Sequence, residues 1–384
     1  MTRQVSAPLP GAPQPWAPSE MPTFRSRPPY VMSEMIAAEP ALAERLIRRL
    51  ATDDALEALV TQVRESADAV RPIVTTGCGT SEHAAMGIAA LLNEALGLPA
   101  GREVRCVQAL ETLHRPLRNG LLIAVSHEGG THATNDAIRT ARDAGAQTAL
   151  ITVGGGSPGA GLAELVILTD EQDRSWCHTV GYLSPILVGI ALVARLAKSP
   201  PDAVAMHALL NVSTDPRAAA DVAAGLAGVD SLMIIGSGAD YVTARELALK
   251  VAEGARLTAQ AYELETILHG HLAAATRWTG LLAVLTGGPP PVMDRARKVL
   301  AAAEALGMPS AAILAETFDG ALAANTTPAG RIVLPQIGRV PGLAGPLLAA
   351  AVALQLLTER LARARGVNPD TLGREDATQA MAHS

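Results

Sequence analysis

The chain has 384 residues, of which 49% are apolar, and its 31 basic and 37 acidic side chains give a formal charge of −6 at pH 7. This length and apolar content suggest two domains with large cores and exclude wholesale disorder. The acidic balance offers no basic field for nucleic acid or an anionic membrane, and 2% aromatic content leaves few side chains on which bases stack, so we expect neither partner.

The N-terminal segment, residues 1–29, is rich in proline and almost free of apolar runs, which predicts a disordered tail. It has no continuous apolar stretch of the kind that a signal peptide needs. Cys78, Cys106 and Cys177 lie far apart without a CxxC pair, so neither a disulfide scaffold nor a zinc knuckle is supported. We therefore expect a cytoplasmic protein.

An apolar, strand-like run that ends in Gly-x-Gly occurs twice in the chain. Each copy is followed by a helix-like stretch and by two further apolar runs in the same register. The paired runs are 73–79 with 232–238, 121–125 with 281–285, and 148–153 with 311–314. Helix-like segments at 135–144 and 294–306 precede the third pair. This pattern indicates two tandem copies of one α/β unit.

Continuous apolar runs that alternate with helices are typical of parallel sheets covered on both faces. We predict two tandem, doubly wound, three-layer αβα domains with parallel sheets, over residues 30–200, including a leading helix, and residues 215–370. A linker begins near 198–202, and residues 371–384 form a C-terminal tail. In such sheets ligands bind beyond the carboxyl ends of the strands, so we look for chemistry in the loops there.

The first such loop, residues 77–83, opens a helix, so its free backbone N–H groups face a potential anion or sugar. Its candidate binding residues are Cys78, Gly79, Thr80 and Ser81. The third glycine of the dinucleotide fingerprint is absent from both copies, so we expect no nicotinamide cofactor, and no cofactor of another kind is indicated. The alternative is that each Gly-x-Gly is an ordinary tight turn.

The second loop, residues 126–131, places small polar residues after a buried strand and suits a hydroxylated ligand. Its candidates are Ser126, His127, Glu128 and Thr131. Gly-Cys-Gly-Thr-Ser-x-His-Ala-Ala, followed about fifty residues on by Ser-x-x-Gly-x-Thr, resembles the sugar isomerase (SIS) superfamily. Within it, the similarity is to the isomerase half of glucosamine-6-phosphate synthase and to its deaminase, deglycase and ketose–aldose isomerase relatives.

The resemblance implies that both predicted domains are SIS domains. It also implies that the segment 176–179 lines a sugar pocket, with His178 and Thr179 as contacts.

Residues 342–357 form the longest apolar stretch, which is shorter than the ~20 residues that cross a bilayer and contains Pro346. We expect a buried core helix there.

Glu246, Lys250 and Glu253 fall at i, i+4 and i+7 on one face of a predicted helix. From the residues alone, a solvated, salt-bridged face is the simpler interpretation. The resemblance reverses it, because Glu-x3-Lys-x2-Glu, then Tyr262 and His269, reproduces the family's active-site helix and loop without a gap. It implies that Glu253 carries a proton between C1 and C2 of a sugar, with Lys250 and Glu246 beside it. His269 then assists ring opening and comes from the neighbouring subunit, so we expect a homodimer.

These residue types suit the implied chemistry. Aldose–ketose exchange through an enediol needs one base that removes a proton from one carbon and returns it to the next, which a carboxylate partly desolvated against a lysine does. Ring opening needs an acid or base that changes charge near neutral pH, as histidine does.

Three features depart from the synthase. The chain begins at Met1 without a glutaminase domain, and Ala377 stands where the synthase places its Schiff-base lysine, so we expect no glutamine-dependent amination. Glu128 replaces the second serine of the family's phosphate loop, and a carboxylate there opposes a phosphate dianion unless it points away or pairs with a cation such as Arg174. A metal site at His127, Glu128 and His132 lacks supporting ligand spacing, so we expect no metal.

We therefore predict an aldose–ketose isomerase or a deaminase/deglycase acting on an amino sugar or sugar phosphate, and the sequence does not rank these two reactions. The competing prediction is a regulatory SIS protein that binds a carbohydrate derivative without chemistry. No DNA-binding helix-turn-helix or basic segment precedes the domains. Because of Glu128, we also expect weak binding of hexose 6-phosphates.

Overall fold

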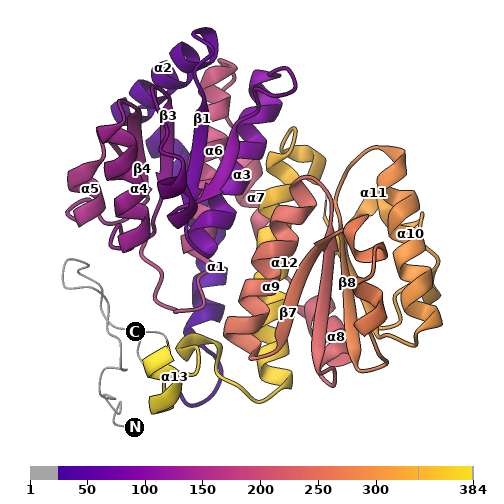
Figure 1. Ribbon diagram of the computed structural model, residues 1–384. Coiled ribbons are helices and arrows are strands. Elements are labelled where there is room, and N and C mark those ends of the chain that lie inside the picture. The colour runs from indigo at the N-terminus through magenta and orange to yellow at the C-terminus, as the bar shows by residue number, and fades with distance from the viewer. Residues whose placement is uncertain (1–24, 336, 383–384) are drawn as a thin grey trace.

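The computed structural model describes residues 25–335 and 337–382, which form two five-stranded parallel sheets with helices packed on them (Figure 1). The strand orders are β2-β1-β3-β4-β5 and β10-β9-β8-β6-β7. Read from its other edge, the second sheet runs β7-β6-β8-β9-β10 and repeats the first, in a doubly wound order. The strands are β1 (Ile73–Gly77), β2 (Arg105–Gln108), β3 (Leu121–Val125), β4 (Gln147–Thr152), β5 (Leu165–Leu168), β6 (Ser231–Gly236), β7 (Thr258–Glu263), β8 (Thr279–Leu285), β9 (Ser310–Ala315) and β10 (Arg331–Leu334).

The central strands are buried along their whole length because helices cover both of their faces. Every residue of β1, β3, β8 and β9 is buried. The apolar runs that predicted paired strands coincide with β1, β3 and β4 in the first half and with β6, β8 and β9 in the second. The predicted α/β class and the parallel sheets are therefore confirmed.

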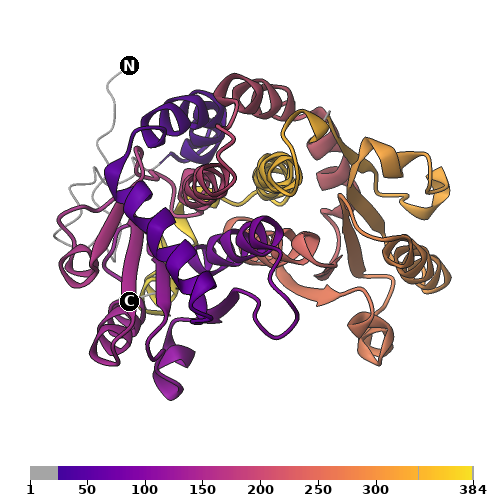
Figure 2. The same ribbon diagram turned by 90° about the horizontal axis from the view of Figure 1, so that it is seen from above.

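Four helices, α3, α6, α9 and α12, lie between the two sheets (Figures 1 and 2). One continuous apolar cluster contains Ile88 of α3, Leu187 of α6, Leu247 of α9 and Leu354 of α12, so both halves share a core. Helices α4 and α5 cover the outer face of the first sheet, and α10 and α11 cover that of the second. The helices are α1 (Val31–Leu50), α2 (Asp54–Asp68), α3 (Thr80–Leu96), α4 (His132–Asp143), α5 (Pro158–Leu162), α6 (Val180–Leu196), α7 (Ala203–Ser213), α8 (Arg217–Leu226), α9 (Ala239–Ala255), α10 (Pro290–Ala305), α11 (Glu316–Asp319), α12 (Ala344–Ala364) and α13 (Ala377–Ala382).

Helix α12 contains the longest apolar stretch of the chain. Within the described residues it is the one helix long and apolar enough to span a membrane, yet 89% of its apolar window is buried inside the protein. It packs on α8 and α9 and between the sheets. The prediction of a buried core helix is confirmed.

The two Gly-x-Gly turns have the same backbone conformation. Gly79 has φ 57° and ψ −127°, and Gly238 has φ 60° and ψ −126°, a combination that favours glycine. A Cβ on Gly77 would lie 2.6 Å from the Ser81 carbonyl carbon, and one on Gly236 would lie 2.4 Å from the Asp240 oxygen. The repeated glycines are therefore required by the strand-to-helix turn in both copies.

The chain outside the two sheets is partly anchored. Most of the predicted tail at 1–29 lies outside the described residues, and Arg25 donates to Glu34 of α1 over 2.8 Å. Near the other end, the Asp370 carboxylate accepts hydrogen bonds from the backbone N–H groups of Val31 and Met32 over 2.7 and 2.8 Å. The segment after α12 is thus fixed to the start of α1. The proposed domain limits stay predictions.

Candidate active site

The candidate site lies where the carboxyl edge of the first sheet meets α9 of the second half. The loop after β1 leads into α3, and Thr80 at the start of that helix donates a 3.2 Å hydrogen bond to Glu246 of α9. His83 lies one helical turn further on, with Nδ1 2.7 Å from the other Glu246 oxygen. The Gly-x-Gly turn of one half is thus joined to the charged helix of the other.

Glu246, Lys250 and Glu253 form one charged row along α9, as their spacing predicts, but this row is not a solvated face. Glu246 is fully buried and Lys250 is 1% exposed, while the Glu253 side chain is 22% exposed. Lys250 Nζ lies 3.7 Å from Glu246 and 2.5 Å from Glu253. The lysine therefore bridges an inner and an outer carboxylate.

The surroundings push the pKa values of the two carboxylates in opposite directions. Burial raises the pKa of Glu246, but Lys250, His83 and Thr80 together outweigh it and hold that pKa below its ordinary value. For Glu253, burial outweighs Lys250 and raises the pKa. Burial lowers the pKa of Lys250, yet both carboxylates raise it further, so the ammonium is retained. Two nearby carboxyl groups with separated pKa values are a typical acid–base arrangement.

The loop between β5 and α6 closes the site from the first half. The Asp173 carboxylate accepts hydrogen bonds from the backbone N–H groups of Thr179 and Gly181 over 2.5 and 3.0 Å, and the Asp173 N–H donates to His127 Nε2 over 2.9 Å. The His127 and His178 rings lie 5.0 Å apart. This loop therefore carries its two predicted contact residues, and Asp173 fixes its shape.

Both histidines are held in the neutral form. Burial lowers the pKa of His127, and the nearby carboxylates of Asp173 and Glu128 only partly oppose that shift. The pKa of His178 falls well below its ordinary value because of burial, because protonating it beside His127 is unfavourable, and because of the positive charge of Lys250. His178 therefore lies close enough to α9 for the charge of Lys250 to lower its pKa.

A glycine on α9 allows this loop to approach. A Cβ on Gly254 would lie 3.0 Å from Cys177 Sγ and 2.8 Å from a Thr358 methyl carbon. Cys177 itself is buried, with Sγ 3.8 Å from the Lys250 carbonyl oxygen. The helix and the loop are in contact at the Lys250–Glu253 end of the row.

The predicted anion-binding residues line the same edge of the first sheet. Ser81 and Ser126 are buried, whereas Thr131 is exposed at the start of α4. Ser126 Oγ lies 3.5 Å from the Thr131 hydroxyl. Cys78 is half-buried, next to Gly79, with Sγ 3.7 Å from Thr134. Burial raises the pKa of the Cys78 thiol, so a reactive thiolate is not favoured there.

Glu128 is hydrogen-bonded to an amide and is not paired with a cation among the described residues. Its Oε1 accepts a 2.9 Å hydrogen bond from Gln172 Nε2. The pairing with Arg174 that we considered is not found, and that guanidinium lies 3.9 Å from Glu34 instead. The carboxylate therefore lies beside the second loop with no cation against it among the described residues.

His269 is not brought to Glu253 within one chain. It follows β7, whose last residue Glu263 pairs with Gly236 at the carboxyl edge of the second sheet, and its side chain is 70% exposed and 2.9 Å from Glu265. Glu253 lies in the last turn of α9, which runs back from that edge to the start of β7. The length of α9 between Ala239 and Glu253 places Glu253 roughly 20 Å along the helix axis from the edge after which His269 follows.

The segment after α12 reaches the site as well. The Trp176 N–H donates to the Asp370 carbonyl oxygen over 3.3 Å, and the Arg374 guanidinium stacks 4.2 Å from the centre of the Trp176 ring. Burial lowers the pKa of Arg374, and the charge of Glu253 opposes that shift. The C-terminal segment thus places a permanent cation near the outer carboxylate.

Sequence reasoning missed three residues that build the site: His83, Asp173 and Gln172. His83 was visible in the Gly-Cys-Gly-Thr-Ser-x-His motif, since it follows Thr80 by nearly one helical turn and so shares its face. The other two lie in an irregular loop whose path no periodicity predicts.

Among the residues that the structure describes, no group of three or more His, Cys, Asp or Glu side chains is arranged to hold a metal ion.

Comparison with known protein families finds a match in the first half of the chain. Residues 69–195 match the family model of the SIS domain. The glutamine–fructose-6-phosphate aminotransferase (isomerizing) of Symbiobacterium thermophilum is 28% identical over 364 residues, which cover 89% of this chain and 57% of that protein. The chain thus spans little more than half the length of this curated relative.

Solved structures share the fold of nearly the whole chain. The C-terminal domain of glucosamine-fructose-6-phosphate aminotransferase from Francisella tularensis gives a TM-score of 0.75 at 18% identity and covers 90% of this chain and 99% of that one. Tagatose-6-phosphate ketose/aldose isomerase from Escherichia coli gives 0.73 at 20% identity, with 91% and 97% covered. Glucosamine-6-phosphate deaminase from Thermotoga maritima gives 0.66 at 18% identity, with 89% and 97% covered.

Proposed function

Because the chain carries an SIS domain and resembles the isomerase half of glutamine–fructose-6-phosphate aminotransferase, we propose that it is a sugar-converting enzyme that transfers a proton between C1 and C2 of a ring-opened sugar. The product is either the isomeric sugar or, for an amino sugar, the deaminated or deglycated one, formed when water replaces the amine and the amine is released. Both reactions share this proton transfer. The observation that carries the proposal is the buried Glu246–Lys250–Glu253 row beside the Gly-x-Gly turn of the first half.

Glu253 is the proposed base. Its partial exposure leaves room for a substrate carbon, and its raised pKa suits a group that takes up and returns a proton near neutral pH. Lys250, 2.5 Å away, keeps the carboxylate oriented. Glu246 stays ionised, and its negative charge compensates the positive charge of the buried lysine. Lys250 therefore remains an ammonium whether Glu253 is protonated or ionised.

The loops of the first half supply substrate binding in this proposal. Backbone N–H groups at the start of α3 and the hydroxyls of Thr80, Ser81 and Ser126 bind the sugar oxygens. His83 Nδ1 lies 2.7 Å from the ionised Glu246, so the ring is held against α9 beside the binding loops. Arg374 adds a guanidinium, which forms no Schiff base, so amination through a C-terminal lysine is not part of the proposal.

Ring opening is assigned to His269 of a second copy of the chain. Within one chain this histidine lies at the opposite end of α9 from Glu253 and is exposed, so a homodimer is needed to bring the two together. Glu265, 2.9 Å from His269 Nε2, would orient its ring. The expected setting is the cytosol.

Solvent exchange tests the proposal. The protein is incubated in deuterated water with fructose 6-phosphate, glucosamine 6-phosphate, and unphosphorylated fructose and glucosamine, and deuterium at C1 and C2 is followed by NMR. We expect exchange with at least one sugar and its loss in Glu253→Gln. Glu94→Gln is the matched control, because Glu94 follows Gly79 at the same spacing at which Glu253 follows Gly238.

One observation favours a second function, a carbohydrate-binding protein without catalysis. His269 is exposed and far from Glu253 within the chain, so a monomer would lack the ring-opening group. In that case the sugar binds, but no exchange at C1 or C2 is seen in wild-type protein. Exchange that persists in Glu253→Gln would instead remove that carboxylate from the role of base.

A further inference from the structure

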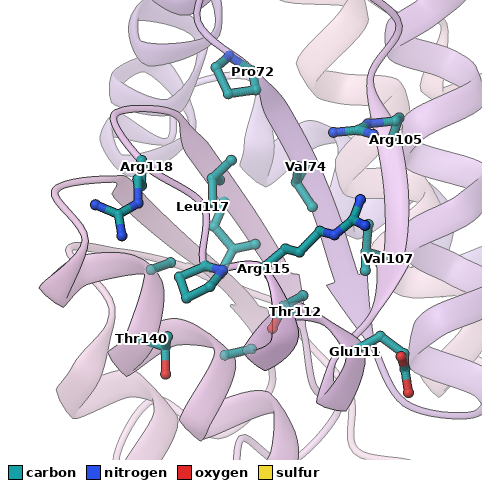
Figure 3. A pocket seen from close by; sticks show the side chains of 14 residues that line it. Pro72, Val74, Arg105, Val107, Glu111, Thr112, Arg115, Leu117, Arg118 and Thr140 are labelled. Carbon is teal, nitrogen blue, oxygen red and sulfur yellow. The ribbon is translucent and has the colours of Figure 1, made fainter.

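A cavity of about 460 Å³ lies on the outer face of the first sheet (Figure 3), and Glu253 is not among the residues that line it. Helices α4 and α5 pack on β3 and β4 on this face, and the cavity lies between α4 and the edge of the sheet formed by β1 and β2. The 3-10 helix η1 (Leu110–His114) and the residues after it form the remaining wall. This volume is within the range of small-molecule sites.

The cavity has an apolar floor and is lined by arginine side chains. Arg105, Val74 and Leu122 are register neighbours on β2, β1 and β3, so they form one row across the sheet. Figure 3 shows Arg115 reaching across the cavity toward Val107, on the side where Arg105 lies. Both arginines are exposed, and within the described chain neither guanidinium makes a hydrogen bond or ion pair, so their N–H donors are free for a ligand.

The charge balance of the lining selects the kind of ligand. Arg105, Arg115 and Arg118 outnumber the single carboxylate, that of Glu111, and leave a net charge of about +2. Arginine forks bind phosphate oxygens in pairs, and the apolar floor suits a flat hydrophobic group. We propose that this cavity binds a phosphate monoester with a flat, apolar body, such as a nucleoside or aromatic phosphate.

The cavity is also connected to the Gly-x-Gly turn of the candidate active site. The Ala109 N–H donates to the Gly77 carbonyl oxygen over 3.0 Å, and Gln108 Nε2 lies 3.5 Å from Cys78 Sγ. The other end of the Gln108 side chain accepts from the backbone N–H of Leu110 over 2.7 Å. A ligand that fixes η1 therefore fixes the groups that hold Cys78, so we assign the cavity an effector role.

Calorimetric titration with phenyl phosphate tests the binding step. We expect saturable binding to wild type, weaker binding of inorganic phosphate and none of benzyl alcohol, because charge and apolar body act together. The double variant Arg105→Gln/Arg115→Gln should lose roughly ten- to a hundredfold in affinity. Glu111→Gln should instead bind more tightly, and a folding defect cannot produce that opposite change.

The control is Arg217→Gln, which removes an exposed arginine on α8 in the other half and should leave binding unchanged. Binding that is indifferent to both the arginine and the Glu111 variants would locate phenyl phosphate elsewhere and overturn the site. So would the absence of binding to wild type. Neither result bears on deuterium exchange at Glu253, so this proposal and the proposed function fail separately.

Alkylation of Cys78 tests the connection. We expect saturating phenyl phosphate to slow carboxymethylation of Cys78 by iodoacetate, measured by peptide mass spectrometry, because an ordered η1 holds Gln108 against the thiol. Cys177 is buried and serves as the internal reference in the same digest. An unchanged rate at Cys78 with a saturated cavity would reject the effector role.

Discussion

Glu253 and Lys250 show how a common surface pattern becomes a site once its surroundings are fixed. Glu and Lys at helical spacing usually form exposed pairs that contribute little. Here the packing of α9 between the sheets buries Glu246 and Lys250, and only Glu253 reaches solvent. Spacing alone cannot distinguish these cases, because burial is decided by elements far away in the sequence.

The acid limb of the pH–rate profile should report Glu253. The carboxylate acts as a base only when ionised, and its pKa is raised, so activity should fall as the pH drops through a value above that of an ordinary glutamate. Lys250 opposes this rise. Lys250→Gln should therefore move the acid limb of kcat/KM to higher pH, while Glu94→Gln leaves it in place. An acid limb unmoved in Lys250→Gln would show that another group is titrating.

Glu128 should weaken the binding of sugar phosphates. Its carboxylate is held by Gln172 and pairs with no cation in the part of the chain that the structure describes. Glu128→Ser should therefore raise the affinity for fructose 6-phosphate by about tenfold and change that for fructose little. Titration calorimetry measures both. Glu171→Gln removes a charge from the neighbouring loop, where Arg45 pairs with it, and serves as the control. An equal gain in both variants would point to net charge and not to the loop.

At the scale of elements, much of the fold could be predicted from the pattern of apolar residues and from the internal repeat of the α/β unit. The apolar runs predicted the six paired strands, because strands buried on both faces read as continuous runs. The short edge strands β2, β5, β7 and β10 were not identified, since they are half-exposed and carry residues such as Arg105 and Glu263. The segment 176–179 was recognised only as a candidate, and the closure of its loop through Asp173 depends on contacts that spacing does not encode.

The paired Gly-x-Gly turns allow stability and binding to be separated. Gly79→Ala and Gly238→Ala introduce a Cβ at the same left-handed φ, with no severe clash at either position, so each should lower the free energy of unfolding by about 1–3 kcal/mol. Gly79 precedes Thr80 of the candidate site, whereas Gly238 begins α9 at the end far from Glu253. Urea unfolding should therefore give similar losses, whereas sugar titration should show weaker binding in Gly79→Ala alone. Equal loss of binding in both variants would contradict sugar binding by the loops of the first half.

At the scale of the molecule, the shared core explains why one half carries the loops and the other the charged helix. Helices α3 and α9 pack together between the sheets, so Thr80 and His83 of one copy meet Glu246 of the other. The repeat predicted two copies but not this face-to-face arrangement. The relative placement of the halves depends on which apolar helix faces are left uncovered, and a single sequence does not give that pairing.

The last prediction concerns assembly. If His269 serves the Glu253 of a second chain, then Glu253→Gln and His269→Ala are each inactive alone, but mixing them after mild dissociation should restore activity. In a randomly mixed dimer population, about a quarter of the sites then combine an intact Glu253 with an intact His269. Sedimentation should show a dimer for wild type and both variants.

A mixture that stays inactive while heterodimers are detected by mass spectrometry would reject the shared site. Activity of His269→Ala close to wild type would do the same, and would point to a group already beside Glu253. His83 is the candidate for that role, because it is the one histidine within hydrogen-bonding distance of the charged row among the described residues. The double variant His83→Gln/His269→Ala would then lose the activity that His269→Ala keeps.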